Sequence, residues 1–468
     1  MKKRSGYQEV TTEILDLLAA IVGEKNVLTD EARENYARDE TIKIQPVLPE
    51  VVLKPGDTES VSRIMALATE RKIPVTPRGG GTGISGGAVP VKRGIVLSLE
   101  RMNKIIEVDK DNFTATVEAG VVLADFYQAV EEQGLYYPLY PGDTSATLGG
   151  NASTNAGGLR AVKYGVTKNY VLGLEAVLPS GEVIHTGGKF VKCSTGYDLT
   201  QLLVGSEGTL AVITKITLRL ILPPGRRELL FVPYHSLHDA IRSVPAILKK
   251  GIFPVGMEFM EHDIVSLVEK YTEKEIPLHD YEAYLMMIIE AADEDEINRM
   301  ASDIGEVCLQ HGAVDVFMPG SEGAKRRLLE FREKFYNAVS HMGVLDIVDV
   351  VVPRSRIADF VEQIKEISQR HRVPIIAYGH AGDGNVHLHM EPTGEDDSEK
   401  KVKEILTEIY RLGVSLGGEI SGEHGLGFTK KGYLELAADK GKMTLMRRIK
   451  QLFDPNNIMN PGKVIDLE

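Results

Sequence analysis

The spacing of apolar and polar residues predicts short strands and helices throughout the chain, with a change of pattern near residue 225. Before that point, LAVITKITLRL (210–220) alternates with the period of two that a half-buried strand shows. A hairpin is predicted at 170–187, with its turn at Pro179-Ser180-Gly181. The other strands predicted in this part are 49–53, 73–76, 95–99, 105–109 and 114–120. The predicted helices are 11–22, 30–38, one capped by Asp57 that runs to 72, and 122–133.

Beyond Pro223-Pro224-Gly225, strand-like and helix-like segments alternate along the chain. The strand-like segments are LLFVPY, GMEFME, YLMMIIEA, AVDVFM, DIVDVVVP and PIIAY. The predicted helices are 236–250, 262–271, 294–312, 323–340 and 355–371. A last helix is expected to end at Asp454-Pro455 and to lead into an extended tail. This order of elements predicts a second, α+β domain, so the fold class is α+β.

Composition and charge exclude several classes of protein. The 468 residues are 43% apolar and 26% charged, which is typical of a soluble chain of more than one domain. A net charge of -13 argues against nucleic acid or an anionic membrane as a partner. No apolar run approaches the ~18 residues of a membrane helix, and the N-terminus is interpreted as a mature surface helix. Cys193 and Cys308 form no pair motif, which favours a reducing, cytoplasmic location.

Glycine is concentrated in three clusters. Of the nine residues from Gly79 to Gly87, six are glycine, and this run directly follows a predicted strand. Such a loop can direct several amide N–H groups at one anion, typically a pyrophosphate. It matches neither the dinucleotide fingerprint nor a P-loop, and the alternative is a purely structural turn.

The second cluster, PGDTSATLGGNASTNAGGLRAVKYG (141–165), combines small residues with hydroxyl and amide groups. Small side chains let a flat ligand lie against the backbone, and hydroxyl and amide groups offer hydrogen bonds. A loop of this length without secondary structure of its own is more often functional. We therefore expect it to line a ligand site, the alternative being a long surface loop.

These segments, together with KCSTGYDLTQLLVGSEGTLAVIT (192–214), resemble the FAD-binding domain of the vanillyl-alcohol oxidase and para-cresol methylhydroxylase superfamily. The similarity is to its FAD-linked D-2-hydroxyacid dehydrogenases, of the D-lactate dehydrogenase and glycolate oxidase flavin subunit type, and it extends from about residue 40 to Lys463. It implies an N-terminal helical segment (1–40), a two-part FAD-binding domain (41–225), a substrate or cap domain (226–420) and a C-terminal segment (421–468) that returns to the flavin domain.

The resemblance also implies which residues contact FAD. The first loop would take the pyrophosphate, the second the flavin and ribityl chain, and the third would lie near the adenine. The residues carried over are Arg78, Gly79, Gly80, Gly81, Thr82, Gly83, Ser85, Gly86, Pro141, Gly142, Thr144, Ser145, Gly149, Ser153, Asn155, Gly158, Glu207, Gly208, Ile213 and, from the tail, Asn460. Because 76–90 contains no histidine, noncovalent FAD is expected.

The third glycine cluster carries a group of histidines. YGHAGDGNVHLHM predicts that His380 and His387 face each other across a hairpin, and ISGEHGLG adds Glu423 and His424. Two histidines and a glutamate form a known catalytic metal set that suits zinc, iron or manganese. By spacing alone His389 is a rival ligand. The alternative is that some of these histidines are hydrogen-bonded core residues.

In the family that this chain resembles, the metal ligands fall at His380, His387 and Glu423, and the catalytic base falls at His424. The resemblance places a substrate-carboxylate arginine at Arg332, a role that a planar guanidinium suits. The D-2-hydroxyglutarate enzymes carry a lysine where this chain reads LDIVDVVVP, and its absence favours a small monocarboxylate.

The predicted activity is therefore FAD-dependent oxidation of a small D-2-hydroxy acid, D-lactate or glycolate, to the 2-oxo acid. The chain has no nicotinamide fingerprint and too few cysteines for an iron–sulfur cluster, so we expect an electron-accepting partner, either an electron-transferring flavoprotein or an iron–sulfur subunit. The alternatives are an oxidase that uses dioxygen, a flavin-free zinc hydrolase, and a noncatalytic electron-transfer subunit. Homo-oligomerisation stays open.

Overall fold

The computed structural model describes residues 6–394 and 398–467, and these form two compact units. The first unit takes in the chain up to Ala156, Val166–Pro223 and the chain from His424 onward. The second takes in Gly157–Gly165 and Pro224–Glu423. The chain thus passes between units four times: after Ala156, after Gly165, after Pro223 and after Glu423.

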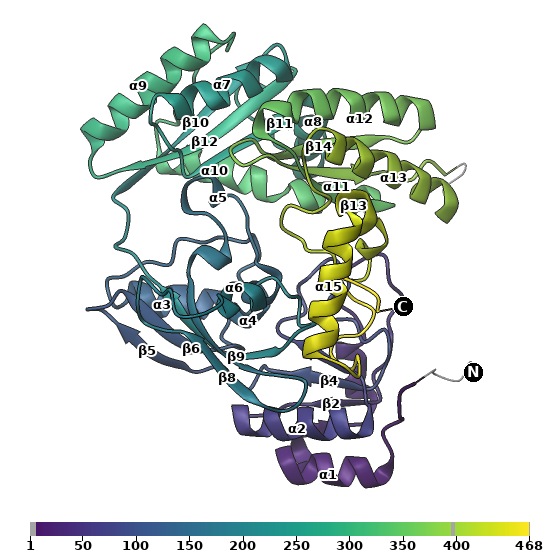
Figure 1. Cartoon of the computed structure of the whole chain (residues 1–468). Helices are drawn as coiled ribbons and strands as arrows, with labels where there is room; N and C mark the ends of the chain where they lie inside the picture. The colour runs from purple at the N-terminus through teal and green to yellow at the C-terminus, as the bar shows by residue number, and fades with distance from the viewer. Residues whose placement is uncertain (1–5, 395–397, 468) are drawn as a thin grey trace. The chain divides into compact units, whose positions relative to one another are not determined.

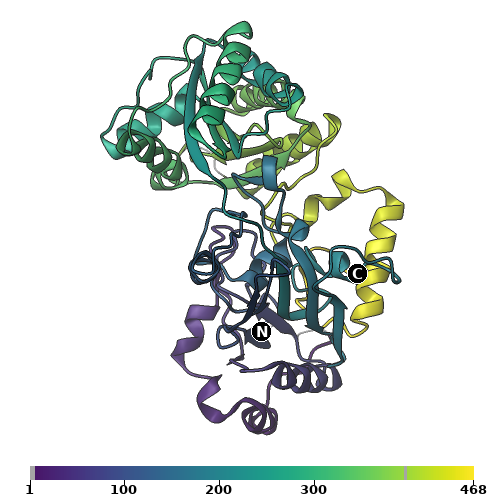
Figure 2. The ribbon, with the colours of Figure 1, turned by 90° about the vertical axis from the view of Figure 1, so that its left-hand side faces the viewer.

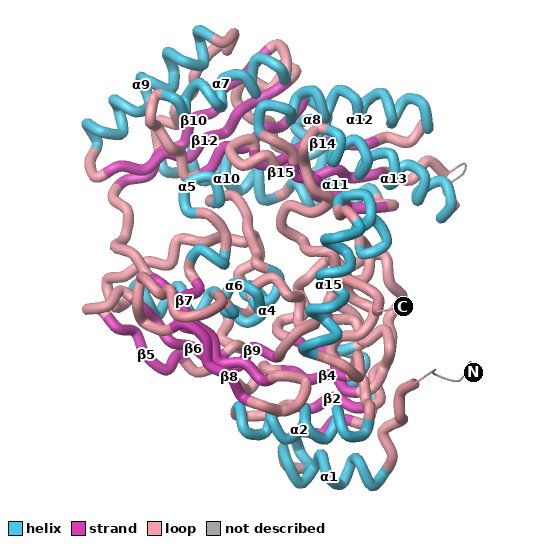
Figure 3. The backbone as a smooth tube through the Cα atoms, viewed as in Figure 1, coloured by secondary structure: helices cyan, strands magenta, loops and turns pink. Residues whose placement is uncertain are grey.

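The first unit is built on two sheets, which Figure 3 shows as two groups of magenta strands. In the sheet of order β1-β2-β4-β3, β4 is parallel to both β2 and β3, whereas β1 is antiparallel to β2. The sheet of order β5-β6-β9-β7-β8 is antiparallel throughout and contains the predicted hairpin, β7–β8. The strands are β1 (Val27–Leu28), β2 (Val51–Leu53), β3 (Val75–Arg78), β4 (Ile95–Ser98), β5 (Ile105–Asp109), β6 (Thr114–Glu118), β7 (Val171–Val177), β8 (Val183–Gly187) and β9 (Val212–Arg219).

The helices of this unit follow the predicted caps and apolar faces. Asp57 caps α2 by accepting the N–H of Ser60, and α2 buries Val61, Ile64 and Met65 on one face. The C-terminal tail runs beside β3, where Asn460 N–H donates to the carbonyl of Val75. Figures 1 and 2 both show the long yellow helix α15 in this unit. Its helices are α1 (Thr12–Val22), α2 (Thr58–Arg71), α3 (Leu123–Glu131), α4 (Leu148–Thr154), α6 (Leu199–Leu203), α14 (Leu434–Ala437) and α15 (Lys440–Phe453).

The second unit is built on one six-stranded sheet in which every pair of neighbours is antiparallel. Its order is β10-β12-β11-β14-β15-β13, so strands far apart in sequence lie side by side, and every residue of β11 and β15 is buried. The aromatic side chains of Phe231, Tyr284, Phe335 and Tyr378 belong to its core. The strands are β10 (Arg226–Tyr234), β11 (Gly256–Glu261), β12 (Ala283–Ala291), β13 (Asp346–Val351), β14 (Ile375–His380) and β15 (Asn385–Met390).

Seven long helices and one short helix belong to this unit among the residues described. Each long helix carries an apolar face, and Figure 1 shows them in teal and green around the sheet. They are α5 (Ala161–Tyr164), α7 (Leu237–Lys249), α8 (His262–Thr272), α9 (Glu294–Gln310), α10 (Glu322–Glu333), α11 (Phe335–Met342), α12 (Ile357–His371) and α13 (Glu399–Ser415).

The α+β class is confirmed, but three predicted elements were wrong in detail. The segment AVDVFM (313–318) forms no strand, because it stays largely exposed beside β10 and makes only isolated bridges through Ala313 and Phe317. The predicted helix 323–340 is two helices, since the backbone leaves the helical ladder at Lys334. The predicted helix 30–38 is a 3₁₀ helix, Glu31–Tyr36. Within the described part of the chain, no helix has the length and apolar character needed to cross a bilayer.

Candidate active site

In the first unit, the first two glycine clusters meet around one cavity of about 150 Å³. Gly79 follows β3 directly, and a Cβ there would lie 2.2 Å from Thr147 Oγ1, so only glycine allows the two loops to touch. Gly149 is equally constrained, because its Cβ would lie 2.6 Å from that of Ala119. The walls therefore consist largely of backbone and small side chains, which suits a ligand that binds to amide groups.

Twelve of the residues predicted to contact FAD line this cavity. They are Arg78, Gly79, Gly80, Gly81, Thr82, Gly83, Gly149, Ser153, Glu207, Gly208, Ile213 and Asn460. The remaining eight, which are not among its lining residues, are Ser85, Gly86, Pro141, Gly142, Thr144, Ser145, Asn155 and Gly158. Gly158 belongs to the second unit. Thr147 and Thr154, whose hydroxyl groups belong to the second glycine cluster, also line the cavity, as does Asn151, which sequence reasoning missed.

Two of the predicted residues have a clear structural task. The guanidinium of Arg78 is buried and donates to the carbonyl of Arg38 at 2.7 Å, and its Cζ lies 5.6 Å from the ring centre of Tyr36. Ser85 Oγ donates to the carbonyl of His424 at 2.9 Å. Arg78 thus holds the chain around residue 38 against the cavity, and Ser85 holds the segment that carries the predicted base.

Glu207 also contacts the segment that follows His424. Its carboxylate accepts the N–H groups of Leu426 and Gly427, each at 2.8 Å. Burial raises the pKa of Glu207, and the two amide bonds oppose that shift. Through these two hydrogen bonds, the carboxylate anchors the backbone after His424.

The C-terminal tail closes the same region of the first unit. The amide of Asn460 donates to the carbonyls of Gly87 at 3.0 Å and Glu207 at 2.9 Å. Lys463 lies behind it, fully buried, with its ammonium 2.6 Å from the carbonyl of Val89. Burial lowers the pKa of Lys463 to about 7, and Asp39 and Glu207 oppose this shift only in part.

In the second unit, two histidines and a glutamate converge as the sequence predicts. His380 ends β14 and His387 lies in β15, across the hairpin. The Nε2 atoms of these histidines are 3.4 Å apart, and Oε1 of Glu423 lies 3.4 Å from His387 Nε2 and 3.8 Å from His380 Nε2. An ion bound at about 2.1 Å to three such atoms needs separations of about 3.0 Å in octahedral and about 3.4 Å in tetrahedral geometry. The donor set and its spacing therefore fit a divalent cation.

His389, the rival ligand, points to a different partner. Its Nε2 lies 2.8 Å from the hydroxyl of Tyr378, and the two rings stack with centres 5.3 Å apart. Among the residues that the structure describes, the converging ligand atoms belong to His380, His387 and Glu423, and not to His389.

A buried carboxylate that sequence reasoning missed lies beside the ligands. Glu258 of β11 pairs in register with His380, and its Oε1 is 2.5 Å from His380 Nδ1. Its Oε2 lies 2.8 Å from Nε and 2.5 Å from Nη2 of Arg332. Although burial opposes the change, His380 and Arg332 lower the pKa of Glu258, and Glu258 raises that of His380 well above its ordinary value. An acidic residue inside the apolar strand GMEFME was the available clue.

Arg332 is held on three sides. Besides the ion pair with Glu258, its Cζ lies 4.9 Å from the ring centre of Phe335 and 5.2 Å from that of Tyr378. Stacking between aromatic rings leaves a guanidinium little rotational freedom. Because the ion pair uses Nε and Nη2, Nη1 is the nitrogen outside it.

Asp349 of β13, in the second unit, holds the backbone of the segment that carries Glu423. Its Oδ2 accepts the N–H of Glu423 at 2.8 Å and that of Gly422 at 3.1 Å. Ser421 Oγ also donates to this carboxylate. Both ends of ISGEHGLG are therefore fixed by carboxylates, buried Asp349 before the predicted base and half-buried Glu207 after it.

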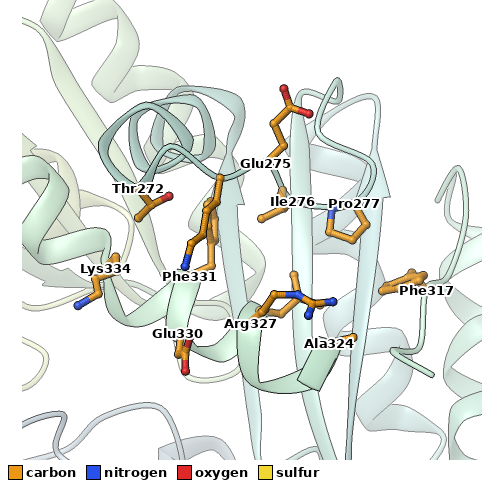
Figure 4. A pocket seen from close by; sticks show the side chains of 12 residues that line it. Thr272, Glu275, Ile276, Pro277, Phe317, Ala324, Arg327, Glu330, Phe331 and Lys334 are labelled. Carbon is orange, nitrogen blue, oxygen red and sulfur yellow. The ribbon is translucent and has the colours of Figure 1, made fainter. Parts of the chain in front are cut away.

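A separate pocket lies on the second unit between α8, α10 and the loop after α8 (Figure 4). Ile276, Pro277 and Phe331 form apolar parts of its wall, and Arg327 and Lys334 also line it. None of the candidate metal ligands lines it.

Comparison with known proteins agrees with this arrangement. Residues 49–187 match the FAD binding domain family, and residues 223–464 match the family of FAD linked oxidases, C-terminal domain. A D-lactate dehydrogenase of Archaeoglobus fulgidus is 44% identical over 89% of this chain and 91% of its own. The glycolate oxidase subunit GlcD of Bacillus subtilis is 38% identical over 97% of both chains. The structure of p-cresol methylhydroxylase has a TM-score of 0.79 at 18% identity, covering 98% of both chains, which shows the common fold.

The fold and the glycine-lined cavity define an FAD-binding oxidoreductase with the architecture of the vanillyl-alcohol oxidase and para-cresol methylhydroxylase superfamily. Within that class, the chain belongs to the FAD-linked oxidase family, whose members similar to it include D-lactate dehydrogenase and a glycolate oxidase subunit. The resemblance seen in the sequence is confirmed, and the flavin-free hydrolase is contradicted.

Proposed function

We propose that the protein oxidises a small D-2-hydroxy acid, D-lactate or glycolate, to the 2-oxo acid. The observation that carries this proposal is the cluster of His380, His387 and Glu423, with Arg332 linked to His380 through Glu258. The substrates in the names of the similar proteins, D-lactate and glycolate, support the same class. A 2-hydroxy acid offers what such a site recognises: adjacent hydroxyl and carboxylate oxygens for a cation and a carboxylate for a guanidinium.

Each residue has one task in this proposal. FAD, when bound, accepts the hydride from Cα, and a divalent cation supplies Lewis acidity at the substrate hydroxyl. His380, His387 and Glu423 would hold the cation, and Arg332 would bind the substrate carboxylate through its guanidinium. His424, directly after Glu423 in the chain, would take the hydroxyl proton, a task that suits an imidazole near pH 7.

Two features support the choice of a small monocarboxylate and of noncovalent FAD. The segment LDIVDVVVP forms β13 and carries buried Asp346 and Asp349 rather than a lysine, so it offers no cation for a second carboxylate. No histidine lies in 76–90, beside the cavity. We propose zinc, iron or manganese as the metal, and FAD held without a covalent link.

We also propose that electrons leave to a separate protein, an electron-transferring flavoprotein or an iron–sulfur subunit. The two cysteines cannot hold a cluster; Cys193 is exposed and Cys308 is buried. Both cysteines are free thiols, which supports the reducing cytoplasm as the proposed location. An oxidase that reduces dioxygen is the second candidate, and turnover in air without a dye acceptor would favour it.

The experiment that tests the proposal is anaerobic mixing of the purified, metal-replete holoenzyme with single substrates. D-lactate or glycolate should bleach the flavin absorbance, whereas L-lactate and D-2-hydroxyglutarate should do so far more slowly. Preferred bleaching by D-2-hydroxyglutarate would contradict the monocarboxylate assignment, and an unbleached spectrum with all four would contradict the substrate class.

A further inference from the structure

Glu258 touches both a candidate metal ligand and the candidate substrate arginine. Its side chain has no solvent exposure, and its two oxygens are divided between two partners: Oε1 contacts His380 Nδ1 at 2.5 Å, and Oε2 contacts Arg332 Nε at 2.8 Å. The arrangement follows from topology, since β11 lies beside β14 and pairs Glu258 with His380.

We propose that Glu258 is a positioning residue that sets the orientation of His380 toward a metal and of Arg332 toward the substrate carboxylate at the same time. The inference rests on the proposed function, because it assumes that a metal and a carboxylate bind here. Glu258 contacts neither of them in this proposal and acts only through its two partners.

The first part of the argument concerns the imidazole tautomer. When Nδ1–H of His380 donates to Glu258, the lone pair of the neutral ring is left on Nε2. Nε2 is the atom that lies 3.4 Å from His387 Nε2 and 3.8 Å from Glu423 Oε1. The hydrogen bond from His380 to Glu258 therefore leaves Nε2 of His380 free to bind a metal, and Nε2 is the nitrogen that His387 and Glu423 face.

The second part concerns the guanidinium. Glu258 binds Nε and Nη2, while Phe335 and Tyr378 flank the plane. A guanidinium held in this way can present Nη1 in one direction only. Because Glu258 binds both His380 and Arg332, it fixes the distance between the metal site and the arginine. A 2-hydroxy acid must span this distance when it binds to both.

The competing explanation is that Glu258 and Arg332 form a purely structural ion pair. The variant Glu258→Gln distinguishes this explanation from the positioning role. An amide has one acceptor oxygen and one donor nitrogen, so Glu258→Gln cannot accept from both partners. With its oxygen toward Arg332, it would turn an N–H toward His380 and favour the tautomer that protonates Nε2. Removal of an outer partner of this kind typically weakens metal binding by ~10–100-fold.

The test is a competition titration of the FAD-loaded protein with Mn²⁺ and with Zn²⁺ against a chelating dye. Glu258→Gln should weaken metal binding by ~10–100-fold while FAD content stays at the wild-type level, and KM for D-lactate should rise. Glu261→Gln is the matched control: it lies on the same strand, is also buried and pairs with Lys365 rather than a histidine. Its metal affinity should equal that of the wild type.

A second pair of variants keeps the proposal testable if Glu258→Gln folds poorly. Arg332→Gln leaves the Glu258–His380 bond in place and should bind metal normally, whereas Arg332→Gln with Glu258→Leu, which offers His380 no acceptor, should lose ~10–100-fold. Equal metal affinity in these two variants, or unchanged affinity in Glu258→Gln, overturns the positioning role. The outcome is distinct from failure of the proposed function, which would show as no metal binding or no oxidation of D-lactate by the wild-type protein.

Discussion

The carboxylate of Asp349 accepts the main-chain N–H of Glu423 at 2.8 Å, so a strand residue fixes the backbone of a candidate metal ligand. Glu207 does the same for Leu426 and Gly427 on the other side of His424. A glycine-rich segment would otherwise have many conformations to lose when a metal binds. These two carboxylates therefore keep the segment ordered before any ligand arrives.

Replacement of Asp349 should disturb this order. A buried hydrogen bond to a charged group contributes about 1.5–3 kcal/mol, and Asp349→Ala removes two bonds to amides. We expect weaker metal binding and slower flavin reduction, with FAD content unchanged, as measured by metal titration and rapid mixing. Asp346→Ala, on the same strand but bonded to its neighbour Ile347, should keep the metal. Normal metal affinity in Asp349→Ala would contradict the anchoring role.

Loss of Arg332 should reduce both substrate affinity and stability. Arg332→Ala should raise KM for D-lactate by an amount equivalent to ~2–5 kcal/mol, the usual effect of truncating a desolvated partner. It also leaves Glu258 buried with one charged partner fewer, which typically costs about 3–5 kcal/mol of stability. Arg332→Ala with Glu258→Gln should regain part of the thermal stability but not the substrate affinity. Arg326→Ala, exposed on the same helix, should change neither, and unchanged kinetics in Arg332→Ala would refute the assignment.

His387→Ala and His424→Ala should fail in different ways. Without His387, two ligands cannot hold the cation, so metal analysis should show depletion while the FAD absorbance persists. His424→Ala should keep both metal and FAD but reduce the flavin ~10²–10⁴-fold more slowly. Loss of metal in His424→Ala would make His424 a ligand, and full metal content in His387→Ala would exclude the proposed site.

Lys463 should make stability depend on pH above neutrality. Its pKa is about 7 in the folded protein against about 10.4 in an unfolded chain, so the unfolded chain binds more protons between these values. The free energy of unfolding should therefore rise as the pH increases from 7 to 10. Lys463→Met should show a smaller rise of melting temperature over this range than the wild type. Exposed Lys440→Met should follow the wild type, and equal slopes in all three proteins would contradict the lowered pKa.

Much of the local structure could be predicted from the sequence. The cap at Asp57, the hairpin β7–β8 and the alternation in β9 depend on neighbours in the chain, and they form as expected. The convergence of His380 with His387 was also predictable, because AGDGN forms a tight turn between their two strands. Sequence reasoning was wrong for 313–318, where edge position and exposure decide against a strand.

The sequence by itself determined the motifs: glycine loops that must approach a ligand, two histidines across a turn, and a glutamate followed by a histidine. Only the tertiary structure brought Glu258 to His380 and Arg332, because neighbours in an antiparallel sheet are chosen by long-range pairing rather than by sequence distance. The same holds for Asp349 and Glu207, whose partners lie 74 and 219 residues away. A buried carboxylate needs a partner, but which partner it finds depends on the packing of the whole unit.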